Sequence, residues 1–322
     1  MNIKKLMLIM KDRIYAYLCM LLTCGLLLSC EKVVFDEETT GTEGAQTANV
    51  VIRVADVEAG WGNNTSRTLV NVSEVCSRLN FAVYQNGSRV KYKNQAVGDS
   101  DFGTFSLELE TGSYQLLVLA HSCKANPATT NPAKLQFSNP ESSNGTGFTD
   151  TFYYYGDLVV DASGTQANIS MKRATTMFRL VTSDVKPSSV KKFQFYYEGG
   201  SGALNAVTGL GCVDSKQSVF VMLDDAQTGQ PLSFDMYTFL HAETGNVSFT
   251  VKAFDTNDDI KFEKEFTNVP MQRNCITRYT GSFFDVDDPT PPDDPVTPDP
   301  EEPASSVIMV DPEWGNIFDY SY

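Results

Sequence analysis

The chain has 322 residues, a formal net charge of −15 and a sequence pI of about 4.5. A protein this acidic is not expected to bind nucleic acid, or to bind an anionic membrane surface through its charge. The length favours two domains over one.

The N-terminus has the pattern of a bacterial lipoprotein signal. Four basic residues precede an apolar run that ends in Leu-Leu-Leu-Ser-Cys at residues 26–30. Cleavage between Ser29 and Cys30, followed by acylation of Cys30, would make lipid chains the membrane anchor. An ordinary secretory signal and a retained helix are the alternatives, although residues 14–28 are short for a span, which needs about 20 apolar residues. We predict a signal peptide at residues 1–29 and lipidation at Cys30.

Residues 30–48 are rich in Thr, Gly, Glu and Gln and include three consecutive acids, Asp36, Glu37 and Glu38. This composition predicts a flexible, acidic tether between the lipid and the fold. The predicted signal carries four basic residues and one acid, a charge of +3, so the remaining 293 residues carry −18. Such a charge favours solubility at an exposed surface.

Four cysteines remain downstream of Cys30, namely Cys76, Cys123, Cys212 and Cys275. None belongs to a Cys-x-x-Cys pair, so the sequence gives no support to a zinc-ribbon or redox site. Two interpretations stay open. Export permits disulfides, Cys76 with Cys123 and Cys212 with Cys275, and four buried thiols are equally compatible with the sequence.

From residue 49 onward the sequence is a series of short segments with β-type alternation. In residues 104–110, Phe105, Leu107 and Leu109 alternate with polar residues. Asn86-Gly87 between two such segments is a strong hairpin signal. The first block, residues 49–172, has expected strands at 49–54, 79–84, 90–93, 104–110, 114–120, 152–160 and 165–171, with a long loop at 124–149.

A second block occupies residues 173–285. Its expected strands lie at 176–182, 192–197, 218–223, 232–240, 246–254, 260–266 and 277–284. We find no long apolar stripe with the 3.6-residue period of a helix. Closely spaced strands with Gly, Asn and Pro turns predict an all-β fold of two tandem β-sandwich domains.

The C-terminal part changes character twice. Residues 286–304 repeat Asp-Pro, Pro-Pro and Glu-Glu-Pro, which cannot form a sheet ladder and predict an extended acidic linker. Residues 305–322 are again apolar and aromatic, so we predict one or two strands that dock in cis or in trans. The candidate donor-strand residues are Val307, Ile308, Met309, Val310, Ile317 and Phe318.

The sequence shows little that points to catalysis, and we predict no enzymatic activity, cofactor or metal. The two histidines, His121 and His241, lie at the ends of apolar strands in different blocks, which favours structural roles. Residues 255–259 carry three aspartates but lack the EF-hand spacing, so a hairpin turn is favoured over a calcium site. Residues 152–155, Phe-Tyr-Tyr-Tyr, are interpreted as half-buried strand residues rather than a sugar-stacking platform.

The order of these features resembles a known family. A lipobox cysteine and an acidic tether are followed by the strand and turn signatures at residues 107–121, 152–154, 171–174 and 274–279. This pattern is similar to the FimB-type fimbrium anchor and fimbrillin-like lipoproteins of anaerobic Gram-negative bacteria, over about residues 30–284. The resemblance implies two tandem transthyretin-like Greek-key sandwiches, lipid attachment to the outer membrane through Cys30, and fimbrial subunits as partners. It provides no catalytic residue.

The resemblance implies an outer-membrane surface lipoprotein that anchors or caps a fimbrium and takes part in its assembly by β-strand addition. One alternative is a polymerising stalk or tip subunit, whose first strand would be removed by a protease. Arg67 is the candidate cut site, although an ordinary exposed loop arginine is the favoured interpretation. The other alternative is a surface lipoprotein that binds a host or bacterial glycan through exposed aromatics such as Trp61 or Tyr153.

Overall fold

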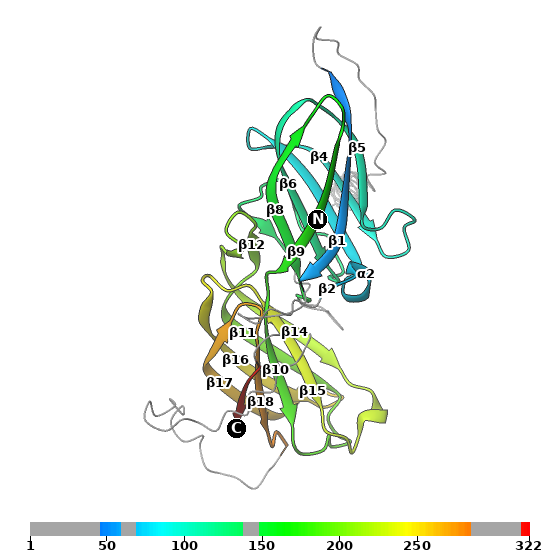
Figure 1. Ribbon diagram of the computed structural model, residues 1–322. Helices are drawn as coiled ribbons and strands as arrows, with labels where there is room; N and C mark the ends of the chain where they lie inside the picture. Colours follow the sequence, from blue (N-terminus) through cyan, green and yellow to red (C-terminus); the bar gives the residue numbers. More distant parts are fainter. Residues whose placement is uncertain (1–45, 59–68, 138–147, 285–316) are drawn as a thin grey trace, which may run out of the picture. The chain divides into compact units, whose positions relative to one another are not determined.

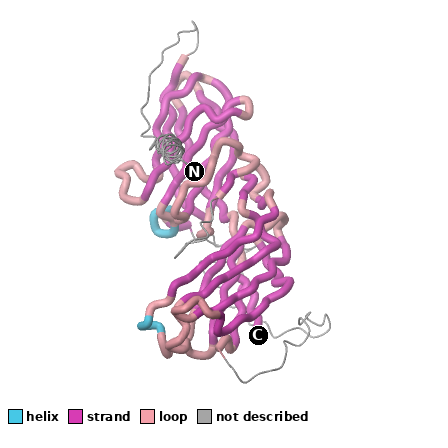
Figure 2. The backbone as a smooth tube through the Cα atoms, turned by 180° about the vertical axis from the view of Figure 1, so that it is seen from behind, coloured by secondary structure: helices cyan, strands magenta, loops and turns pink. Residues whose placement is uncertain are grey.

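The computed structural model describes residues 46–58, 69–137, 148–284 and 317–322. Strands dominate these ranges, and the helical segments are the short α2 (Val72–Val75) and the 3-10 turn η1 (Asp225–Gln227) (Figure 2). The fold is therefore all-β, as predicted. In the described ranges, no helix is long and apolar enough to cross a membrane.

The first group of strands forms two layers. One has the order β5–β1–β9, and the other has the order β4–β3–β6–β8 (Figure 1). Their bounds are β1 (Thr47–Glu58), β3 (Arg78–Gln85), β4 (Ser88–Ala96), β5 (Thr104–Glu110), β6 (Gly112–His121), β8 (Phe152–Val160) and β9 (Thr165–Arg173). The short β2 (Leu69–Val70) extends the first layer beside the end of β1. The layers meet where β8 and β9 pair at Phe152–Arg173 and Tyr153–Lys172.

Side chains alternate between the two faces along these strands, and this alternation explains why the strands form two layers around one core. Alternate side chains of β1, β3, β6 and β9 enter one apolar cluster, represented by Ile52, Phe81, Val118 and Ile169, all buried. The intervening side chains point to the other faces of the two layers. Burial of one face per layer fixes the register, because a slip of one residue would expose the whole apolar set.

The second group repeats this arrangement. One layer has the order β15–β10–β18–β19 and the other β14–β11–β16–β17. The strands are β10 (Thr176–Thr182), β11 (Lys192–Ser201), β14 (Asp214–Met222), β15 (Ser233–Thr238), β16 (Thr244–Phe254), β17 (Ile260–Gln272), β18 (Ile276–Gly281) and β19 (Ile317–Ser321). A second apolar cluster with Phe178, Phe193 and Phe249 lies between the layers.

The two groups share one topology up to their seventh long strand. In each group the first strand pairs in parallel with the seventh, β1 with β9 and β10 with β18, and antiparallel with the fourth, β5 or β15. The second and fifth strands are the central pair of the other layer in both groups. The second group differs from the first in its additional strand, β19.

The hairpin predicted at Asn86-Gly87 is confirmed. It joins β3 to β4, with Gln85 opposite Ser88. Asn86 has φ 50° and Gly87 has φ 78°, so both central residues adopt the left-handed conformation of a type I′ turn. Asn and Gly tolerate that conformation better than other residues.

The loop predicted at residues 124–149 is only partly a loop. Within its described part, β7 (Leu135–Gln136) pairs with β12 (Ala203–Asn205), which also pairs with β13 (Leu210–Gly211). Leu135 and Leu204 are fully buried in a third apolar cluster that also includes Phe239. The loop therefore contains a strand because residues from the second group, distant in sequence, supply its partner and its core.

Candidate functional site

A strand from the C-terminal part of the chain completes one edge of the second sandwich. β19 pairs in parallel with β18, from Ile276 opposite Ile317 to Thr280 opposite Ser321. In Figure 1, β19 is the red strand that leads to the C mark beside β18. Parallel neighbours cannot be joined by a tight turn. Here 35 residues, 282–316, separate the two strands in the sequence.

The two paired strands match each other residue by residue. β18 reads Ile-Thr-Arg-Tyr-Thr-Gly, and residues 317–322 read Ile-Phe-Asp-Tyr-Ser-Tyr. The first pair is apolar, since Ile317 is buried in a small cluster with Met177 and Ile276. The main-chain hydrogen bonds of a ladder would hold any extended segment, whereas these side chains select a particular one.

The third pair is ionic. Arg278 donates from Nε to Asp319 Oδ1 at 2.5 Å and from Nη2 to Oδ2 at 2.9 Å. The two side chains are 22% and 25% exposed. A bidentate guanidinium–carboxylate pair adds geometric specificity to its energy, because both hydrogen bonds need one register. A slip of β19 along β18 would break this pair.

Aromatic contacts hold the C-terminal end of the docked segment, at Tyr320 and Tyr322. The rings of Tyr279 and Tyr320 stack with centroids 4.9 Å apart, and Tyr322 meets Phe266 edge to face at 5.0 Å. Lys264 Nζ lies 5.1 Å from the centre of the Tyr322 ring. Burial raises the pKa of Tyr279 to about 12, so its hydroxyl stays protonated at neutral pH.

Gly281 makes room for the backbone of the docked strand. A Cβ atom there would lie 2.0 Å from the carbonyl oxygen of Tyr322 and 3.0 Å from its carbonyl carbon. The three nearest atoms all belong to Tyr322, so the missing side chain of Gly281 serves the docked strand specifically.

We expect Gly281→Ala to loosen β19 and leave the rest of the sandwich folded. The added methyl overlaps main-chain atoms that must move, and such overpacking costs about 1–3 kcal/mol. Chymotrypsin cleavage after Phe318 should then become about tenfold faster or more, because cleavage follows the population of the opened strand. Gly245→Ala is the control, since a Cβ there meets only Leu240 Cδ2, at 3.7 Å. Equal cleavage rates in both variants would contradict this role of Gly281.

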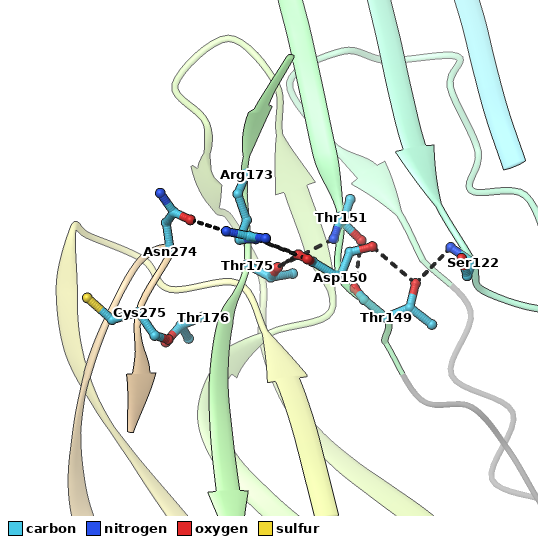
Figure 3. Close-up of polar contacts among 9 residues, drawn as sticks. All are labelled: Ser122, Thr149, Asp150, Thr151, Arg173, Thr175, Thr176, Asn274 and Cys275. Atoms are coloured by element: carbon cyan, nitrogen blue, oxygen red, sulfur yellow. Dashed lines mark hydrogen bonds and ion pairs between the residues drawn. The ribbon is translucent and has the colours of Figure 1, made fainter. Parts of the chain in front are cut away.

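A buried polar cluster lies where the first strand group passes into the second. Figure 3 shows Arg173, at the end of β9, between Asp150 and Asn274. Its Nε donates to both oxygens of Asp150, at 2.9 and 3.0 Å, and its Nη1 donates to Asn274 Oδ1 at 2.6 Å. The Thr175 hydroxyl donates to Asp150 Oδ1 at 3.0 Å, and the guanidinium lies 4.8 Å from the Phe152 ring centre.

This cluster connects three segments that are distant in sequence. Asp150 precedes β8, Arg173 ends β9, and Asn274 lies in the turn before β18. The Arg173 side chain is 2% exposed, so its charge depends on these partners in place of water. The cluster therefore fixes the start of β10 and β18, the two strands that lead to the β19 site.

Most of the site residues predicted from sequence lie outside the described residues. These are Ser29, Cys30, Arg67, Val307, Ile308, Met309 and Val310, together with Trp61. Ile317 and Phe318 are described and lie in β19, opposite Ile276 and Thr277. Their donation to another chain stays a prediction.

The other candidate residues have structural surroundings. His121 is buried and bonded to Asn80, whereas His241 pairs with Asp214 at 3.0 Å. Asp255 accepts from the amides of Asn257 and Asp259 and pairs with Lys261, which holds the pKa of Asp255 below its usual value. The predicted turn is the arrangement observed.

Tyr153 is half-buried against the third apolar cluster, with its hydroxyl 3.5 Å from Arg273 Nη1. That position agrees with the packing interpretation of residues 152–155. The four cysteines downstream of the predicted signal are free thiols, and three of them are buried, namely Cys76, Cys123 and Cys275.

The sequence alone did not identify the β18 residues that contact β19. Arg278, Tyr279 and Gly281 were assigned to an ordinary strand. The signal that could have found them is the match between Ile-Thr-Arg-Tyr-Thr and Ile-Phe-Asp-Tyr-Ser, in which an arginine aligns with an aspartate. An in-register parallel pair places equal positions side by side, so the alignment predicts the ion pair.

Comparison with known proteins gives the family. No curated protein matches the chain. Similar solved structures include a DUF1812 protein from Bacteroides thetaiotaomicron VPI-5482 that is proposed to bind polysaccharide (13% identity, 69% of this chain and 80% of that chain covered, TM-score 0.44). A second is the fimbrial anchor protein Mfa2 from Porphyromonas gingivalis (12% identity, 69% of this chain and 83% of that chain covered, TM-score 0.40). A third is a fimbrial assembly protein from Parabacteroides distasonis ATCC 8503 (14% identity, 74% of this chain and 92% of that chain covered, TM-score 0.36). The model of the family of unknown function DUF6562 matches residues 41–316, and the chain belongs to that family.

Proposed function

We propose that the chain is an outer-membrane surface lipoprotein that anchors or caps a fimbrium and takes part in its assembly by β-strand addition. Residues 1–29 are its signal peptide, Cys30 carries the lipid, and residues 30–48 are the tether. Residues 49–172 and 173–285 are two sandwich domains, followed by the linker at 286–304 and the strand segment at 305–322. The protein acts by binding other subunits, without catalysis.

One observation carries this proposal: the edge of β18 takes up an extended segment through a ladder and a set of matched side chains. β-strand addition between subunits needs the same two elements, main-chain bonds for affinity and side-chain pockets for register. An edge that recognises its own segment can take up an equivalent segment of a neighbour. The net negative charge and the lipid at Cys30 suit a protein that stays at the membrane and presents this edge outward.

A polymerising stalk or tip subunit is the second candidate, and the long connection to β19 favours it. The 35 residues between β18 and β19 can span at most about 120 Å, which is enough to reach a neighbouring molecule. In this role Val307, Ile308, Met309, Val310, Ile317 and Phe318 leave their own chain and complete a sheet of the next one. The contacts at the edge of β18 would support both the anchoring role and the polymerising role.

Cys30→Ala tests the anchoring role in cells that express the protein. We expect the variant to lose lipid labelling and membrane association, and fimbrial protein to appear in the medium, because the tether no longer ends in acyl chains. Cys212→Ala, which removes an exposed thiol from the folded part, is the matched control and should change neither property. Fimbriae that stay on the cells carrying Cys30→Ala would contradict the anchoring role.

The mature N-terminus separates the two candidates. A surface protein that begins at Cys30 is expected for the anchor. A protein that begins after Arg67 would have lost β1, which lies between β5 and β9 in its sheet. The vacant position would then accept a strand from another subunit, and the polymerising role would replace the anchor.

A further inference from the structure

The strand β9 presents an open edge at the position where the second sandwich has β19. β9 and β18 are the seventh long strands of their groups, and each pairs in parallel with the first strand of its group. On the side away from β1, residues 165–171 have no partner strand within the described part of the chain. The corresponding edge of β18 holds β19.

This edge lacks the protection that the other open edges have. Natural sheets discourage pairing at an edge with charged residues, prolines or bulges. Every other described strand of five or more residues with an open edge, β4, β5, β8, β14, β15, β17 and β19, contains at least one charged residue. Lys172 and Arg173 of β9 lie where it pairs with β8, and the open stretch, residues 165–171, reads Thr-Gln-Ala-Asn-Ile-Ser-Met and contains no charged residue. An uncharged open edge indicates that another strand covers it.

The position of β19 shows which strand can reach this edge. Ile317 lies opposite Ile276, and Ile276 lies opposite Met177 near the start of β10. β10 begins three residues after Arg173, where β9 ends. The chain that precedes Ile317 therefore leaves β18 at the end of the second sandwich that adjoins β9. A short connection before Ile317 is enough to bring an upstream segment beside β9.

We propose that Val307, Ile308, Met309 and Val310 of the same chain pair in parallel with the open edge of β9. These residues are uncharged like the edge, and three of them are β-branched, which favours a strand. The six residues 311–316 can span about 20 Å between the two strands. The segment would run beside β9 toward the start of β10, turn, and continue as β19. This docking does not depend on the fimbrial role.

Hydrogen exchange over residues 165–173 of the intact mature chain tests the proposal. Successive amides of a strand point to opposite sides, so those of β9 that point away from β1 report on this edge. We expect them to be protected in the native chain and to exchange at least tenfold faster in Ile308→Asp. Val296→Asp, which adds the same charge within the proline-rich linker, should leave them protected. The amides of β18 should stay protected in both variants.

Unprotected outward amides in the native chain, or equal protection in Ile308→Asp, would overturn the proposal. Protection that disappears on about hundredfold dilution would also overturn it, because the strand would then come from a second copy. The readout is independent of the anchoring test, since Cys30→Ala and Ile308→Asp report on different segments. Failure of one therefore does not entail failure of the other.

Discussion

Replacing Arg173 by methionine is expected to lower the free energy of unfolding by about 3–5 kcal/mol, because removal of one partner leaves the other charge of a buried pair uncompensated. Arg173 is 2% exposed and Asp150 is 18% exposed, so little water can replace the guanidinium. Asn274 loses its donor at the same time. Chemical denaturation followed by circular dichroism measures the change.

Arg179→Met is the matched control for this prediction. Arg179 also donates two hydrogen bonds to one aspartate, from Nε to Asp235 Oδ1 at 2.7 Å and from Nη2 to Oδ2 at 3.0 Å, but these two side chains are 25% and 34% exposed. Partly exposed pairs contribute about 1 kcal/mol or less. If Arg173→Met and Arg179→Met reduce stability equally, the buried cluster does not have the structural role assigned to it.

The second large effect is a loss of stability at mildly acidic pH caused by His121. Burial, and to a smaller degree the charge of Arg78, lower the pKa of His121 to about 4. The hydrogen bonds explain why the neutral ring is preferred. His121 Nδ1 accepts from the Cys123 amide at 3.1 Å, so the proton lies on Nε2 and is donated to Asn80 Oδ1 at 2.8 Å. A second proton on Nδ1 would face the Cys123 N–H.

The sign of the effect follows from proton binding. Between pH 6.5 and about 4, the unfolded chain binds a proton at His121 and the folded chain does not. Stability therefore falls as the pH falls through this window, by about 3.5 kcal/mol in total at about 1.4 kcal/mol per pKa unit. Above pH 6.5 the contribution of this group is constant.

Comparison of the native chain with His121→Gln isolates this term from the carboxylates. We expect the free energy of unfolding of the native chain to fall more steeply between pH 6.5 and 4 than that of His121→Gln. The difference in slope corresponds to at most one more proton bound by the unfolded chain than by the folded chain. NMR titration of the ring provides a direct control. Parallel pH profiles of the two proteins, or a folded-state titration near pH 6.5, would show that the buried ring is not held neutral.

The strands were predictable where a single segment carries its own pattern. Residues 104–110, 152–160 and 176–182 were predicted with the bounds that the structure has. Alternation and turn residues are local, so the sequence contains them directly. β7 and β12 are too short to show alternation, and they form because Leu135 and Leu204 meet in a shared core. Contacts of this kind cannot be read from one segment.

The candidate site was predictable on one side only. The aromatic content of residues 305–322 indicated a docking strand, and Ile317 and Phe318 do lie in one. The Arg173 cluster could not be predicted because its partners Asp150 and Asn274 lie in two connecting segments, distant in sequence, whose positions depend on the completed fold. The roles of Arg278 and Gly281 could not be predicted before the partner strand was known, because Arg278 pairs with Asp319 and Gly281 lies against the backbone of Tyr322.

We propose that the edge of β18 recognises residues 317–322 by their side chains and that the same segment of another chain can complete it. Arg278→Asp and Asp319→Arg, each on a lipid-free Cys30→Ala chain, test it by light scattering. Each substitution alone puts like charges opposite each other and weakens docking in cis, where the effective concentration otherwise favours the chain's own strand. An equimolar mixture can pair the introduced arginine of one chain with the introduced aspartate of the other. We predict a complex of the two variants in the mixture and none in the double variant, whereas a mixture that stays monomeric would contradict the claim.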